Sequence, residues 1–125
     1  MRCCMTPKNF RVSSKEIGDA AVIYPQGYLN NVTGESLVQE CTEHIEKGTK
    51  KIVISFSKTE LINSIGISML LSIIEKLLNT GGELCFTDMS KMLKDTFEML
   101  GLTQYITSFD TEAEALNYLK AVSRP

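Results

Sequence analysis

The sequence predicts an α/β domain, and three observations lead to that prediction. Strand-like and helix-like segments alternate along the chain, beginning with a strand and ending with a helix. The length of 125 residues suits one domain, and 43% apolar with 22% charged residues is ordinary for a globular chain. Residues 51–56 are a nearly continuous apolar, β-branched run, which is typical of a strand covered on both faces.

The first segments predict a strand and a helix after a polar start. Residues 1–17 are mixed and polar, and we interpret them as an N-terminal tail or an edge strand. Residues 20–24 form a short apolar strand that ends at the Pro-Gln-Gly of 25–27. A helix is expected from near Thr33 to Gly48. Its apolar positions recur every four residues, at Leu37, Cys41 and Ile45.

The most apolar of the predicted helices lies in the middle of the chain. The strand at 51–56 is followed by a loop at 57–60, and Asn63-Ser64 then opens a helix that ends at the Gly pair of 81–82. Its apolar residues follow helical spacing: Ile67, Leu70, Leu71, Ile74, Leu77 and Leu78. Residues 83–87 are the next strand.

The last third predicts a helix, a strand and a final helix. Ser90 is expected to cap a helix closed by Gly101, and residues 105–109 form a short strand. Thr111 and Glu114 have the spacing of a capping box for the C-terminal helix. The predicted core is Ile52, Ile54, Ile67, Leu70, Leu71, Ile74, Leu84, Phe86, Phe97 and Leu100. One folded unit is expected over 18–120, with 121–125 as a C-terminal tail.

Charge and hydropathy indicate a cytoplasmic protein. Thirteen basic and fifteen acidic residues give a net charge of −2, and the only basic pair is Lys50-Lys51, so no direct contact with nucleic acid is expected. No apolar stretch reaches the roughly 18 residues that a membrane span needs. The first eight residues lack the apolar region of a secretory signal.

Metal and catalytic motifs are absent from the sequence. Cys41 and Cys85 fall on apolar faces and are expected to be reduced core thiols. Cys3 and Cys4 are adjacent rather than spaced as zinc ligands, and the single histidine, His44, is interpreted as a helix residue on a partly exposed face. Phosphate-binding loop motifs do not occur. We therefore expect no cofactor, no metal and no catalytic residues.

Ser64 is the residue with the most informative surroundings, because it follows an apolar pair and precedes the buried helix. The simplest interpretation is a helix N-cap, which serine favours. A second is a phosphate acceptor, since a helix N-terminus stabilises an added anion. A nucleophile elbow would require glycine two residues earlier and a histidine partner, and position 62 is isoleucine.

Several segments together resemble the STAS-domain family of bacterial anti-sigma factor antagonists. They span residues 18–119 and are, in order, Gly27-Tyr28-Leu29-Asn30, the strand Ile52 to Phe56, Ile62-Asn63-Ser64-Ile65-Gly66-Ile67, Gly81-Gly82-Glu83-Leu84, Leu100-Gly101-Leu102, Phe109 and Ala115-Leu116. The resemblance implies a mixed sheet of four or five strands with about four helices packed mainly on one face. Residues 18–120 would then be the STAS-like domain.

The resemblance also implies a partner switch rather than an enzyme. In the family, the domain binds an anti-sigma factor that is also a serine kinase and thereby releases a sigma factor. The kinase phosphorylates the serine after the motif aspartate, here Ser64, and a serine phosphatase restores it. The implied partner-binding residues are Asn30, Asn63, Ser64, Ile65 and Gly66.

Three positions depart from the family pattern. Asn30 and Asn63 replace the two motif aspartates, and Ile65 replaces the second Ser/Thr. An amide can cap and turn as aspartate does, but it carries no charge. The alternative function is therefore a constitutive STAS scaffold that binds partners without phosphorylation.

Overall fold

The computed structural model describes residues 12–121 and confirms the α/β fold. Residues 1–11 and 122–125, which hold most of both predicted tails, lie outside the described residues. The elements in chain order are β1 (Val12–Ile17), β2 (Ala20–Pro25), β3 (Gly27–Leu29), α1 (Asn31–Glu46), β4 (Lys51–Ser55), β5 (Thr59–Ile62), α2 (Ser64–Asn79), β6 (Glu83–Thr87), α3 (Lys91–Met99), the 3-10 turn η3 (Leu102–Gln104), β7 (Thr107–Phe109) and α4 (Glu112–Ala121).

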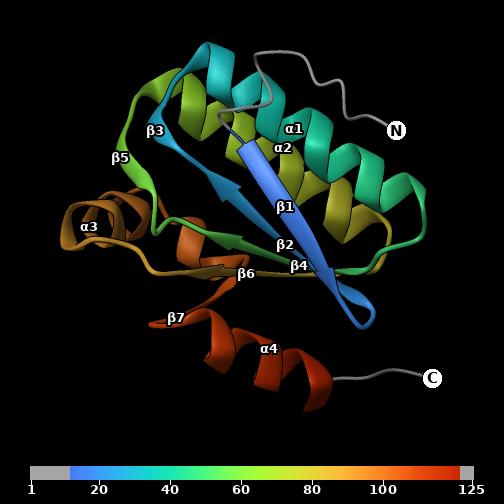
Figure 1. Cartoon of the computed structure of the whole chain (residues 1–125). Helices are drawn as coiled ribbons and strands as arrows, with labels where there is room; N and C mark the ends of the chain where they lie inside the picture. The colour runs from blue at the N-terminus through green and yellow to red at the C-terminus, as the bar shows by residue number, and fades with distance from the viewer. Residues whose placement is uncertain (1–11, 122–125) are drawn as a thin grey trace.

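The main sheet has five strands in the order β1-β2-β4-β6-β7. β1 pairs antiparallel with β2, and the other neighbours are parallel, so the sheet is mixed, as the resemblance implies. Figure 1 shows α1 and α2 lying over one face of this sheet and α4 under the other. The parallel strands are joined by crossover helices, as such pairs require.

Successive residues of the central strands face opposite sides of the sheet, and both sides are buried. Ile52 and Ile54 of β4 pack in the larger core with residues of α1, α2 and α3. Val53 faces the opposite side and packs with Ala115 and Leu119 of α4. Three of the four helices therefore cover one face, which confirms the predicted arrangement and explains the continuous apolar run in the sequence.

Two predicted core residues are wrong. Leu71 is 39% exposed and Leu100 is 52% exposed. Leu71 lies one position around the helix from the buried face of α2, which Leu70, Ile73, Ile74 and Leu77 form. Leu100 is the C-cap of α3, where the helix ends. Ile67 is partly buried against the core, and the other predicted core residues are buried.

The segment expected to be a loop at 57–60 contains the start of a strand. β5 pairs in parallel with β3 to form a separate two-stranded sheet. The prediction missed β5 because its polar start lacks the alternation of a half-buried strand. The predicted last strand at 105–109 is also too long, since only Thr107–Phe109 is a strand.

The cysteines are as expected, whereas His44 is not. Cys41 and Cys85 are free and buried, and burial raises the pKa of both thiols, that of Cys85 to about 12. Neither thiol is therefore a reactive thiolate. Cys3 and Cys4 lie outside the described residues. His44 was expected on a partly exposed face, but it is only 5% exposed because β1 covers the C-terminal half of α1.

Candidate functional site

Both helices that begin beside the small sheet are capped by asparagine. The Asn30 Oδ1 accepts hydrogen bonds from the backbone N–H groups of Val32 and Thr33, at 3.1 and 3.2 Å. The Asn63 Oδ1 accepts one from the N–H of Gly66, at 2.9 Å. The N-cap of α2 is thus Asn63 rather than Ser64, and Ser64 is the first residue of the helix.

The pairing of β3 with β5 brings the two caps together. Leu29 and Ile62 are partners in the parallel register, so Asn30 and Asn63 follow at neighbouring positions. The backbone N–H of Asn63 also donates to the carbonyl oxygen of Leu29, at 3.2 Å. The N-termini of α1 and α2 therefore lie at one end of the molecule, to which two segments distant in sequence contribute.

Gly66 permits a close approach of α2 to β3. A Cβ built at Gly66 would overlap the backbone carbonyl oxygen of Leu29. Where α1 and α2 pack against each other, a Cβ at Gly34 would lie 2.7 Å from the Met69 Cγ, a side-chain atom. The backbone contact makes Gly66 the stricter requirement of the two, because a carbonyl cannot turn aside as a methionine can.

We expect Gly66→Ala to lower the free energy of unfolding by about 1–3 kcal/mol, as overpacking of a filled site does. The gain of up to about 1 kcal/mol in helix propensity from Gly to Ala works against this loss. Urea denaturation measures the difference. Gly34→Ala is the matched control and should cost less, because Met69 can change rotamer. An equal cost for both variants would contradict the role given to the Leu29 carbonyl.

Ser64 is exposed, as predicted, and its hydroxyl is available. Among the residues that the structure describes, none hydrogen-bonds its Oγ, while its carbonyl oxygen accepts from the Ser68 hydroxyl. The first turn of α2 holds no acidic residue, and neither does the first turn of α1. A negative charge added at Ser64 would meet the positive end of the helix dipole and free N–H groups.

Exposed apolar side chains lie on the elements that surround Ser64. They are Tyr28 at 44%, Val32 at 43%, Leu61 at 50% and Ile65 at 47% exposed. Of these four, only Ile65 was expected from the sequence as a partner-binding residue. Tyr28 and Leu61 are partners in the β3–β5 register, on the opposite face from Leu29 and Ile62. Large apolar side chains left exposed together are typical of a protein-binding surface.

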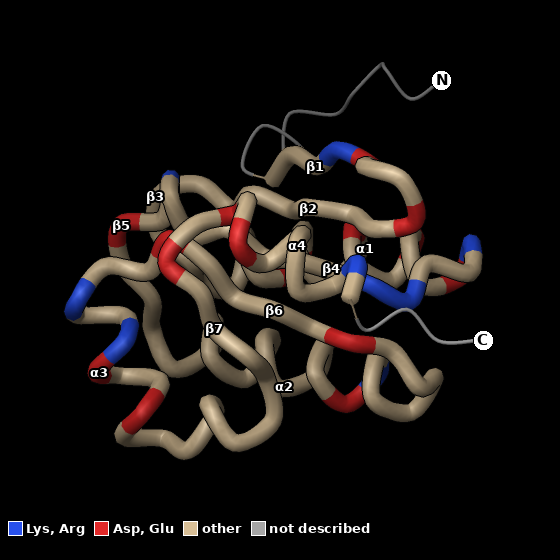
Figure 2. Tube along the Cα trace, turned by 90° about the horizontal axis from the view of Figure 1, so that it is seen from below, with Lys and Arg blue, Asp and Glu red and all other residues tan. Residues whose placement is uncertain are grey.

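Charged residues are otherwise mixed over the molecule. Figure 2 shows basic and acidic residues interspersed along the trace, with both signs on α3. Within residues 12–121, no group of three or more His, Cys, Asp or Glu side chains is placed to hold a metal ion. None of the helices in this range is long and apolar enough to cross a bilayer.

Comparison with known sequences finds related proteins along nearly the whole chain. The protein-family model described as "STAS domain" matches residues 11–115. BtrV of Bordetella bronchiseptica is 26% identical over 100 residues, which are 79% of this chain and 86% of that protein. The anti-sigma F factor antagonist of Paenibacillus polymyxa is 22% identical over 116 residues, 92% of this chain and 99% of that protein.

Comparison with solved structures finds the same fold. The anti-sigma factor antagonist SpoIIAA in its unphosphorylated form has a TM-score of 0.74 at 18% identity, covering 89% of this chain and 99% of that chain. The Bacillus SpoIIAA in its phosphorylated form has a TM-score of 0.70 at 20% identity, covering 86% and 98%. Similarity at this level of identity shows the shared fold.

Proposed function

This chain belongs to the STAS domain family, with anti-sigma factor antagonists among its homologues, and from this we propose that it is a phosphorylation-regulated anti-sigma factor antagonist. In this proposal the unphosphorylated chain binds an anti-sigma factor that has serine kinase activity, and a sigma factor is released. Phosphorylation of Ser64 ends the binding, and a serine phosphatase restores it. The chain itself acts as a binding module and not as an enzyme.

One observation carries the proposal: Ser64 is an exposed hydroxyl at an uncharged helix N-terminus, with large exposed apolar side chains on the elements around it. The apolar residues, with Asn30, Asn63, Ile65 and Gly66, would form the surface that contacts the partner. A phosphate there would add about −1.5 to −2 charges beside two helix N-termini that hold no acidic residue in their first turns. Such a change is large enough to end a contact based on apolar burial.

The direct test uses an anti-sigma factor kinase encoded beside this chain. With ATP present, mass spectrometry should find one phosphate, on Ser64, and the complex should dissociate. Ser64→Ala should bind the kinase and take up no phosphate. Binding without any phosphate on the wild-type chain would favour the constitutive scaffold, and absence of binding would contradict both functions.

The scaffold remains a second candidate because of the two asparagines. Both Asn30 and Asn63 have their side-chain oxygens occupied as helix caps, a role that needs no negative charge. If Asn30 and Asn63 only cap helices, this surface provides no carboxylate for phosphoryl transfer. The chain would then bind its partner without being phosphorylated.

We expect Asn30→Asp with Asn63→Asp to raise the rate of Ser64 phosphorylation several-fold. A carboxylate beside the acceptor hydroxyl can orient it or accept its proton, whereas an amide is a very poor base. Aspartate also caps helices, so both caps should survive. The initial rate of phosphate incorporation measures the effect, and circular dichroism checks the fold. An unchanged rate in a folded variant would leave these residues with the capping role alone.

A further inference from the structure

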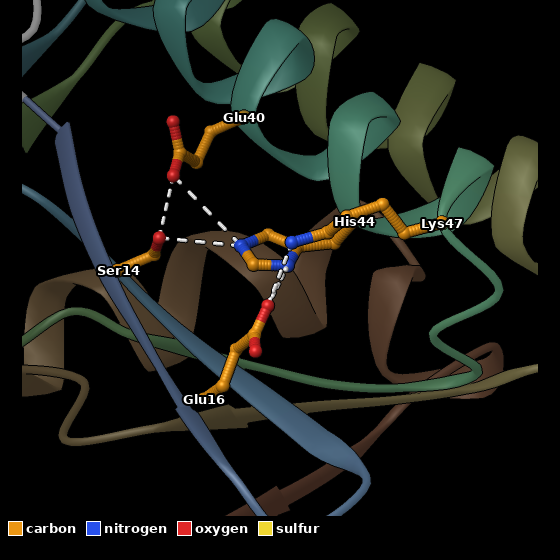
Figure 3. Close-up of polar contacts among 5 residues, drawn as sticks. All are labelled: Ser14, Glu16, Glu40, His44 and Lys47. Atoms are coloured by element: carbon orange, nitrogen blue, oxygen red, sulfur yellow. Dashed lines mark hydrogen bonds and ion pairs between the residues drawn. The ribbon is translucent and has the colours of Figure 1, made fainter. Parts of the chain in front are cut away.

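A cluster of polar side chains lies between β1 and α1, away from Ser64. Figure 3 shows Ser14 and Glu16 of β1 and Glu40, His44 and Lys47 of α1 directed toward one another. The cluster is near the C-terminal end of α1, about 20 Å along the helix from the Asn30 cap at 1.5 Å per residue. It lines an open pocket with a volume of about 370 Å³.

The His44 ring occupies the centre of this cluster. Its Nε2 lies 3.2 Å from the Ser14 Oγ and 3.8 Å from the Glu40 Oε2. Its Nδ1 lies 3.5 Å from the Glu16 Oε2, yet it is buried and makes no hydrogen bond of good geometry among the described residues. Each ring nitrogen therefore faces a carboxylate oxygen, one from α1 and one from β1.

Charged side chains from both elements line the pocket around the ring. Glu40 and Glu43 line the pocket from α1, and Glu16 lines it from β1. Lys47 donates to the Glu16 carboxylate at 2.7 Å.

The remaining charged and titratable groups near the cluster are engaged elsewhere. Lys15, also on β1, is bound to Glu112 of α4 at 2.8 Å. From β2, the titratable group is Tyr24, whose hydroxyl also donates to Glu112.

We propose that His44 is a proton-dependent latch, whose imidazolium form ties the edge strand β1 to α1 and whose deprotonation loosens that strand. The imidazolium carries an N–H at both nitrogens, so it can donate toward Glu16 and toward Ser14 and Glu40 together. The neutral ring has one N–H, which leaves the lone pair of the other nitrogen facing a carboxylate. Histidine is the side chain that ordinarily changes charge between about pH 5 and pH 8.

The position of β1 makes it sensitive to this contact. β1 is the edge of the sheet and pairs with β2 alone among the described strands. Further support comes from α1 through the side chains of this cluster, from the ion pair of Lys15 with Glu112 of α4, and from Val12, which packs in the larger core. The hydrogen bond from Lys47 lowers the pKa of Glu16, so Glu16 stays an anion while the histidine loses its proton. The change in charge is therefore confined to the ring.

The experiment compares amide hydrogen exchange of β1 with that of β4 at about pH 6 and about pH 8, corrected for intrinsic exchange rates. We expect protection of the β1 amides to fall several-fold at the higher pH while β4 stays unchanged. Because the chain has a single histidine, its ring signals in NMR report the titration of His44 without overlap. The titration and the loss of protection should share one midpoint.

Variants separate the latch from a purely structural role. Glu16→Gln with Glu40→Gln keeps the ring and removes both carboxylates, so the difference between the two pH values should disappear. His44→Gln should abolish it as well, and Asp95→Asn, in an exposed ion pair of α3, is the control that should retain it. A ring that titrates without any change in β1 protection would overturn the proposal, and so would a pH difference that persists in the Glu16→Gln, Glu40→Gln variant.

Discussion

Replacing Ile74 with alanine is expected to lower the free energy of unfolding by about 2–5 kcal/mol, the cost of emptying a buried aliphatic site. Ile74 is 3% exposed and belongs to the larger core, between α2 and the sheet. Deleting its side chain removes apolar burial and leaves a cavity that the surrounding helices cannot close fully. Urea denaturation at neutral pH measures the loss.

Leu71→Ala provides the matched comparison on the same helix. Its side chain is 39% exposed, so the same kind of truncation should cost less than about 1 kcal/mol, in the range of surface substitutions. Equal losses for Ile74→Ala and Leu71→Ala would contradict the orientation of α2 described above. A loss for Ile74→Ala below about 1 kcal/mol would place Ile74 outside the core.

Ile74 and Leu71 also show the limit of what helical spacing predicts about burial. Alternation of strands and helices predicts the fold class, because each parallel strand needs a crossover helix. Within α2, however, nearly every position from 70 to 74 is apolar, so the spacing fits two adjacent faces of the helix. In the structure, the buried face of α2 consists of Leu70, Ile73, Ile74 and Leu77, and Leu71 is partly exposed to solvent.

The candidate site was predictable in part. Ser64 at the start of an apolar helix is visible as a local pattern, and Asn63 beside it is a natural cap. The neighbourhood of Asn30 and Asn63 depends on pairing between β3 and β5, which are more than thirty residues apart in the chain. No local pattern indicates that pairing, so the exposed Tyr28 and Leu61 were missed. The burial of His44 is non-local in the same way, since it depends on β1.

Replacing Ser64 with aspartate is expected to weaken binding to the anti-sigma factor by about 2–5 kcal/mol, which is roughly thirtyfold or more in affinity. If Ser64 lies within the contact, partner binding takes the new carboxylate out of water, and the first turn of α2 has no basic residue to compensate it. Ser64→Ala introduces no charge and should bind nearly as the wild type does. Isothermal titration calorimetry or a quantitative pull-down measures both affinities.

Stability distinguishes lost binding from lost folding in this experiment. Aspartate in the first turn of α2 faces the positive end of the helix dipole, so Ser64→Asp should be as stable as the wild type or more stable by about 0.3–1 kcal/mol. Ser72→Asp is the matched control, because it places the same charge at an exposed position on α2, about 12 Å further along the helix. Weak binding by Ser64→Asp alone would locate the partner at the helix N-terminus. If the Asp and Ala variants of Ser64 bind equally well, a charge at this position has no effect on the complex, and the constitutive scaffold becomes the better description of the chain.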